Sequence, residues 1–204
     1  LNSSRPLCIQ ADSSFVSFHI FWLDVAEQAA QIQLLEQPVW ALWQEDSYEF
    51  LVLLFAALQA GKQVLLPPHR VSDLEKELAE QQIYFLKRLP STATSTFELQ
   101  FDAAFLNQAQ LYFYTSGSTG QPKKILRTLQ QLFNEVCGLE ASFDLPEQAI
   151  AIATVSHQHI YGLLFKLLWP LASGRSFYQK QLAFPEDVVD LQKKISHLQL
   201  PNYL

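Results

Sequence analysis

Short apolar runs alternate with segments of helical character along most of this 204-residue chain. Runs of this kind, bounded by Pro, Gly or polar clusters, are typical of buried strands. We expect strands at Val39–Leu42, Gln63–Leu66, Ile83–Leu86, Leu111–Phe113, Ala149–Val155 and Ser176–Tyr178. Strands that alternate with helices usually pair in parallel and are covered on both faces. The sequence therefore predicts an α/β fold of mostly parallel sheet layers flanked by helices.

Helix-start signals occur between these strands. An Asp, Ser or Thr followed three residues later by Glu or Gln is the signature of a helix start. The chain has this signature at Asp46 with Glu49, Ser72 with Glu75, and Thr128 with Gln131. We expect helices over residues 25–35, 47–61, 72–82, 129–139, 160–169 and 185–200. Gly61 is placed to end the second of these helices, and Pro185 suits the first turn of the last.

The composition is that of a folded, acidic chain. Hydrophobic residues make up 49% of it, and 20 acidic side chains outnumber 14 basic ones to give a net charge of −6. A chain of this length and hydrophobicity can bury a sizeable core. Nucleic-acid binding is not expected, because no broad cationic face is available to neutralise phosphates. The apolar runs 50–60 and 160–172 are too short to cross a bilayer, so no membrane span is expected.

The two cysteines, Cys8 and Cys137, cannot form a disulfide framework, and neither belongs to a Cys-x-x-Cys pair. This usage favours a reducing compartment, and we expect a cytoplasmic location. Cys137 falls within an amphipathic helical segment and is expected to be a small core residue rather than a nucleophile.

A loop rich in glycine and hydroxyl groups follows the strand at Leu111–Phe113. It reads Thr-Ser-Gly-Ser-Thr-Gly-Gln-Pro-Lys from Thr115 to Lys123, and we call it the phosphate loop. Its two glycines can take positive φ, so that successive backbone N–H groups turn toward one bound anion. The hydroxyls and Lys123 add further donors. The loop is not a Walker A motif, because Pro122 stands where the second glycine of that motif would be. The alternative is a surface turn that binds nothing.

The phosphate loop resembles the signature of the adenylate-forming superfamily, Thr-Ser-Gly-Ser/Thr-Thr-Gly-x-Pro-Lys-Gly. The match holds at every fixed place up to Lys123, while Lys124 replaces the final glycine. The resemblance implies that the phosphates of ATP are bound by Thr115, Ser116, Gly117, Ser118, Thr119, Gly120 and Lys123.

A second stretch, His159-x-x-Gly162, resembles the next motif of the same superfamily. The resemblance implies that His159, Tyr161 and Gly162 border the carboxylic acid substrate. Alone, this motif is weak. A loop histidine that caps a helix and a core aromatic at Tyr161 are the alternatives. His157 and His159 also have a metal-ligand spacing, but no third ligand is evident, so no metal site is predicted.

Enzymes of this superfamily join a carboxylic acid to the α-phosphate of ATP with the help of Mg²⁺, then pass the acyl group to a nucleophile such as the thiol of CoA or an acyl carrier protein. The resemblance implies that residues 1–204 are an N-terminal fragment of the large AMP-binding domain, with a possible sub-boundary in the loop 90–96. The C-terminal part, the small lid domain and the family's catalytic lysine would be absent, so we expect little activity from the fragment alone. The alternative is a non-catalytic phosphate-binding or interaction module derived from the same fold.

Overall fold

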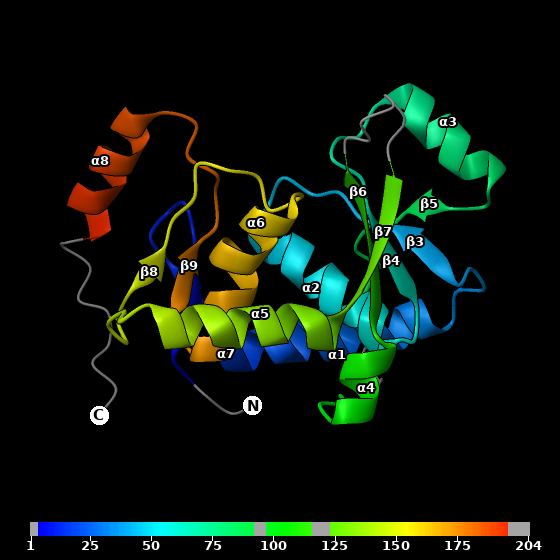
Figure 1. The fold of residues 1–204 in the computed structure, drawn as a ribbon, viewed down its shortest axis with the longest axis horizontal. Helices are drawn as coiled ribbons and strands as arrows, with labels where there is room; N and C mark the ends of the chain where they lie inside the picture. The colour runs from blue at the N-terminus through cyan, green and yellow to red at the C-terminus, as the bar shows by residue number, and fades with distance from the viewer. Residues whose placement is uncertain (1–3, 92–96, 116–122, 196–204) are drawn as a thin grey trace.

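The computed structural model describes residues 4–91, 97–115 and 123–195. These residues form two β-sheets with a layer of helices between them and one further helix on the outer face of each sheet (Figure 1). The predicted α/β fold with mostly parallel sheet layers flanked by helices is confirmed.

The first sheet has four strands in the order β2-β1-β9-β8. β1 pairs in parallel with β9, β9 pairs in parallel with β8, and β2 pairs antiparallel with β1. Its strands are β1 (Pro6–Ile9), β2 (Phe15–Ser17), β8 (Ile150–Ala151) and β9 (Ser176–Tyr178). This sheet therefore joins the beginning of the chain to residues more than halfway along it.

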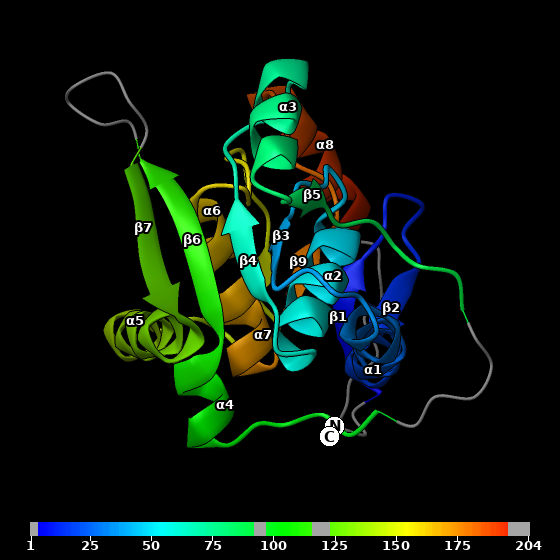
Figure 2. The same cartoon turned by 90° about the vertical axis from the view of Figure 1, so that its right-hand side faces the viewer.

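The second sheet has five strands in the order β5-β3-β4-β6-β7. All neighbouring strands are parallel except the last pair, β6 and β7, which form an antiparallel hairpin (Figure 2). Its strands are β3 (Val39–Ala41), β4 (Gln63–Leu66), β5 (Tyr84–Phe85), β6 (Gln110–Thr115) and β7 (Lys123–Thr128). The short helix α4 (Ala103–Gln108) leads into β6.

One hydrophobic core joins the inner faces of both sheets through the central helices. Leu7 and Phe177 enter it from the four-stranded sheet, and Val64 and Leu111 enter it from the five-stranded sheet. The helices of the layer are α1 (Phe18–Gln33), α2 (Ser47–Gln59), α5 (Leu129–Ser142), α6 (Ile160–Gly162), the π-helical turn η1 (Leu163–Leu168) and α7 (Trp169–Ser173). Every residue of α2 except Glu49 is buried, which explains why most of its sequence is apolar on all sides.

Two outer helices cover the remaining faces. Leu78 of α3 (Ser72–Glu80) packs against Ala41 and Leu65 of the five-stranded sheet. Leu191 of α8 (Pro185–Ile195) packs with Ile9 and Tyr178 of the four-stranded sheet. The molecule is thus layered as helix, sheet, helices, sheet, helix, and both sheets direct the carboxyl ends of their parallel strands toward the upper edge in Figure 1.

Two helix starts are as predicted. The Asp46 carboxylate accepts hydrogen bonds from Tyr48 N and Glu49 N at the start of α2, and Thr128 and Gln131 form a reciprocal capping box at the start of α5. Gly61 follows the end of α2 with a φ of +72°, a value that glycine adopts without strain.

Other helix predictions are corrected. The prediction that Ser72 caps α3 is wrong, because Val71 occupies the N-cap without a side-chain hydrogen bond. α1 begins at Phe18 rather than at residue 25, since Ser17 Oγ accepts a hydrogen bond from Ile20 N and caps the helix earlier.

Some predictions of strands and burial are also wrong. The apolar run 149–155 forms only the two-residue strand β8, which is half-buried because it lies at the sheet edge and pairs on one side only. Cys137 is exposed on α5 rather than packed in the core, and Cys8 is the buried cysteine. Within the described ranges, no helix is long and apolar enough to cross a membrane.

Candidate functional site

The two strands that flank the phosphate loop bring its ends together. β6 ends at Thr115 and β7 begins at Lys123, and these two residues are register partners across the antiparallel hairpin. Lys123 is exposed. The predicted phosphate ligands Ser116, Gly117, Ser118, Thr119 and Gly120 lie outside the described residues, so their roles stay predictions.

Lys124, the residue that departs from the superfamily signature, has partners on one face of β7. Its Nζ lies 5.8 Å from the centroid of the Tyr114 ring and 3.4 Å from Gln81 Oε1. Because neighbouring side chains of a strand point to opposite faces, Lys123 lies on the other face of β7 from Lys124. The lysine that replaces the family glycine therefore does not share the face of Lys123.

The His159-x-x-Gly162 motif forms the turn that enters α6. Gly162 is buried, and a Cβ at this position would lie 2.1 Å from Ser156 O and 2.9 Å from His157 Cα. His159 N donates a hydrogen bond to Ser156 O at 3.3 Å. The glycine is therefore required for the close approach of the 156–157 backbone to the start of the helix.

His159 and Tyr161 are exposed. His159 occupies the N-cap position of α6, but its side chain makes no capping hydrogen bond. Tyr161 is 72% exposed, so the alternative of a core aromatic at this position is wrong. Among the residues that the structure describes, no group of three or more His, Cys, Asp or Glu side chains is arranged to hold a metal ion.

His157, the neighbouring histidine, is the buried one. Its Nδ1 lies 3.1 Å from Ser47 Oγ, its Nε2 lies 2.9 Å from Gln44 O, and its ring packs on Phe50. Burial, assisted by the positive charge of Lys166, lowers the pKa of His157 from 6.5 to about 4. The ring is therefore neutral near pH 7.

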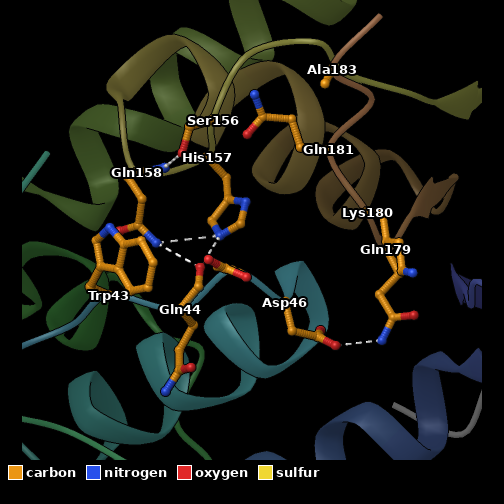
Figure 3. A pocket seen from close by; sticks show the side chains of 11 residues that line it. Trp43, Gln44, Asp46, Ser156, His157, Gln158, Gln179, Lys180, Gln181 and Ala183 are labelled. Atoms are coloured by element: carbon orange, nitrogen blue, oxygen red, sulfur yellow. Dashed lines mark hydrogen bonds between the residues drawn. The ribbon is translucent and has the colours of Figure 1, made fainter. Parts of the chain in front are cut away.

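A pocket of about 630 Å³ opens beside His157 (Figure 3). It is formed by residues 43–46 after β3, residues 156–158 before α6, and residues 179–183 after β9. Because β3 and β9 belong to different sheets, the pocket lies between the two sheets at the carboxyl ends of their strands, the usual position of ligands in open α/β folds.

Polar side chains line much of this pocket. Gln158 Nε2 donates to Gln44 O at 2.8 Å, while the buried Gln158 Oε1 has no hydrogen-bond partner among the described residues. Gln179 Nε2 donates to Asp46 Oδ2 at 2.5 Å across the pocket floor. Figure 3 shows these pairs approaching one another from different segments of the chain.

Ser47, Gln44 and Lys166 are neighbours of His157 that were not predicted from the sequence. Lys166 left one signal, since it is a single charged residue within the apolar run 160–172. Ser47 gave no such signal, because serine is common at helix starts, where it can bond to the nearby backbone.

Comparison with known proteins places these observations in a family. Residues 68–199, a range that includes the phosphate loop and the His159-x-x-Gly162 motif, match the family model described as AMP-binding enzyme. This range is well over half of the chain.

Three individual proteins are similar to parts of the chain. It is 30% identical over 98 residues to a medium-chain-fatty-acid–[acyl-carrier-protein] ligase, JamA, of Moorena producens, covering 44% of this chain and 16% of the relative. It is 33% identical over 73 residues to the mitochondrial malonate–CoA ligase ACSF3 of Mus musculus, covering 36% of this chain and 12% of the relative. The O-succinylbenzoate coenzyme A synthetase (MenE) of Bacillus subtilis, solved with ATP and magnesium ion, superposes with a TM-score of 0.71 at 19% identity, covering 93% of this chain and 57% of that structure.

These figures set the extent of the likeness. The matches to the curated relatives span less than a fifth of those proteins, and the chain spans just over half of the MenE structure. At 19% identity, the likeness to MenE establishes a shared fold.

Proposed function

Because the chain belongs to the family of AMP-binding enzymes, we propose that it carries the ATP phosphate-binding loop and part of the acid pocket of an enzyme that activates a carboxylic acid as an acyl-adenylate. The carboxylate oxygen would bond to the α-phosphorus of ATP as pyrophosphate leaves, and Mg²⁺ would neutralise the phosphates. A carboxylate and a triphosphate repel each other, so the protein has to neutralise the phosphates and hold the acid in line with the α-phosphorus.

The observation that carries this proposal is the hairpin closed by Thr115 and Lys123. Register partners across an antiparallel pair have Cα atoms roughly 4.5–5.5 Å apart, so both ends of the phosphate loop meet at one point. In this proposal the hydroxyl and glycine N–H groups of the loop bind the same polyphosphate as the ammonium of Lys123, which is exposed at the first residue of β7. Such a set of donors fits a polyphosphate, and each charge-assisted hydrogen bond contributes roughly 1.5–3 kcal/mol.

The acid would lie near the start of α6. We assign His159 and Tyr161 to its border because both side chains are exposed next to the turn that Gly162 closes. Gly162 itself lies against Ser156 and has no free face for a substrate, so its part is to shape the turn.

The acyl acceptor would be the thiol of CoA or of an acyl carrier protein. The names of the relatives support this class, since JamA is described as an acyl-carrier-protein ligase and ACSF3 as a CoA ligase. We further propose that residues 1–204 are the N-terminal part of the large AMP-binding domain, with little activity alone. The exposed free Cys137 is compatible with the cytoplasmic location that we propose.

A second function is a non-catalytic module that keeps the phosphate loop and lacks turnover. The family match over residues 68–199 fits this function too, because such a module would keep the phosphate loop within that range.

Carboxylate-dependent exchange of labelled pyrophosphate into ATP tests the proposal. It should be measured on this chain and on the longest natural chain that contains it, with a panel of fatty, dicarboxylic and aryl acids. We expect exchange by the longer chain with at least one acid, and at least a tenfold loss on Lys123→Ala, equivalent to about 1.4 kcal/mol.

Lys124→Ala is the matched control, because Lys124 is adjacent in sequence but lies on the opposite face of β7. Exchange should change less than about twofold in this variant. ATP binding without exchange by any acid would favour the non-catalytic module. Equal losses in both variants would contradict the assignment of Lys123.

A further inference from the structure

Lys166 is a buried cation in the centre of the molecule. It lies in the π-helical turn η1, is 1% exposed, and stands between Phe165 and Leu167 in the sequence. Its Nζ donates to Ser47 Oγ at 2.6 Å and to Gln179 O at 3.3 Å. Within the described ranges no carboxylate forms an ion pair with it. A buried charge without an ion-pair partner destabilises a fold, so hydrophobic packing alone does not explain a lysine at this position.

The hydrogen bonds around Lys166 have a fixed direction. An ammonium group can only donate, so Ser47 Oγ accepts from Lys166. The Ser47 hydroxyl proton is then directed to the other close partner, His157 Nδ1, at 3.1 Å. His157 Nδ1 must therefore be the acceptor, and the ring proton lies on Nε2, which donates to Gln44 O at 2.9 Å. The chain of contacts runs from Lys166 through Ser47 and His157 to Gln44.

The other charged and titratable groups around this chain are few. Asp46 at the N-cap of α2 and Cys8 of β1 both act on Lys166 and favour its charged form. Burial has the largest effect and lowers the pKa of Lys166 from 10.5 to about 8, which leaves the ammonium protonated near pH 7. Asp46 accepts a hydrogen bond from the side-chain amide of Gln179, and the backbone carbonyl of Gln179 accepts one from Lys166.

This chain of contacts joins segments that are distant in sequence. Ser47 and His157 are 110 residues apart, and Lys166 and Ser47 are 119 residues apart. It holds His157 against the end of β3, and the backbone just before His157 closes on Gly162 and accepts from His159 N. Whatever fixes His157 thus fixes the turn from which His159 projects.

We propose that Lys166 and Ser47 are positioning residues, which together with Gln44 O hold the ring of His157 in place as its Nε2–H tautomer and thereby hold the His159 turn in place for the carboxylic acid. The part of this proposal that concerns the acid rests on the proposed function, whereas the tautomer of His157 does not. Neither residue is assigned contact with a substrate.

The tautomer is tested by long-range ¹H–¹⁵N NMR of the histidine rings in this chain at pH 7. We expect His157 as the Nε2–H form in the natural sequence. Ser47→Ala, which removes a single oxygen atom, should keep the Nε2–H form, because Gln44 O still accepts from it, and should shift the ¹⁵N resonance of Nδ1 by removing its hydrogen-bond donor. Lys166→Met should move the His157 titration to higher pH by removing a neighbouring positive charge. Lys180→Met, which alters an exposed lysine at the pocket, should change neither property.

The outcomes separate the two parts of the proposal. An Nδ1–H form in the natural sequence, or an unchanged Nδ1 resonance in Ser47→Ala, overturns it. Circular dichroism of both variants is recorded first, and loss of the fold in both assigns the network to the core alone and also overturns the proposal.

The catalytic consequence is measured in the longer adenylating chain. Ser47→Ala should raise KM for the acid about tenfold with KM for ATP unchanged, because only the acid side of the site is displaced. A shifted Nδ1 resonance with an unchanged acid KM overturns the role at the acid. If no acid supports exchange at all, the proposed function fails while the NMR result still decides the tautomer.

Discussion

A side chain at Gly162 and the carbonyl oxygen of Ser156 cannot occupy the structure together, since the Cβ would lie 2.1 Å from that oxygen. Gly162→Ala should therefore displace the turn and destabilise the fold by about 1–3 kcal/mol, the range found for overpacked sites. Urea denaturation of both proteins measures this difference in the free energy of unfolding.

Gly138→Ala is the control for that experiment. Gly138 lies within the helix α5, and a Cβ there meets no atom within 4 Å. Alanine should stabilise this helix by about 0.5–1 kcal/mol through its higher helix propensity. If both substitutions had the same sign, close packing at Gly162 would not be the reason for the glycine.

His157 should make the protein sensitive to acid. Its pKa is about 4 in the folded protein and 6.5 ordinarily, so between these values the unfolded chain binds more protons. The free energy of unfolding should therefore fall as the pH falls from 6.5 to 4, by about 3 kcal/mol from this residue.

His157→Gln removes the titrating ring, and its stability should decline less over the same pH range. Chemical denaturation at a series of pH values gives the two curves. His19→Gln, which replaces an exposed histidine, serves as the control. Its free energy of unfolding should change with pH as steeply as that of the natural sequence. An unchanged slope in His157→Gln would show that other groups cause the acid sensitivity.

Asp46 stabilises more than the helix that it caps. Its Oδ1 accepts from Tyr48 N and Glu49 N, and its Oδ2 accepts from Nε2 of Gln179, the residue that follows β9. Asp46→Ala should cost about 2 kcal/mol, the upper end of the range for N-caps, because a contact between distant segments is also lost.

Asp102→Ala provides the comparison, since Asp102 caps the short helix α4 through Phe105 N alone and is exposed. It should cost about 0.5–1 kcal/mol. Thermal unfolding of the two variants under identical conditions ranks them. An equal loss would indicate that the Gln179 contact adds nothing.

Arg175 holds the loop after α5 through the geometry of its guanidinium group. It donates to both carboxylate oxygens of Glu140 and to the carbonyls of Leu145 and Pro146. Lysine keeps the charge but cannot reproduce this set of planar donors. Arg175→Lys should therefore cost about 1 kcal/mol, because the buried guanidinium loses hydrogen bonds that one ammonium group cannot replace.

The exposed pair of Arg70 and Glu75 gives the matched control for Arg175. Arg70→Lys should change the free energy of unfolding by less than about 0.5 kcal/mol. Denaturant titration distinguishes the two variants, and a small effect at Arg175 would mean that water replaces its contacts.

The amino-acid sequence by itself determined the features whose causes are local. Asp46 and Thr128 each cap a helix through residues no more than three positions further along the chain, so both caps could be recognised from their spacing. The alternation of strands and helices and the phosphate-loop signature are local in the same sense. They predicted the fold class and the family that the match over residues 68–199 supports.

Only the tertiary structure decided how strands are shared between two sheets and which polar groups meet in the core. β1 pairs with β9 although most of the chain separates them, and Ser47 meets His157 across 110 residues. It also decided that His157 is buried while His159 is exposed, two residues away in a turn. Hydrogen bonds between distant segments leave no periodic pattern in a sequence, because each residue is compatible with its own helix or turn whether or not the distant partner is present.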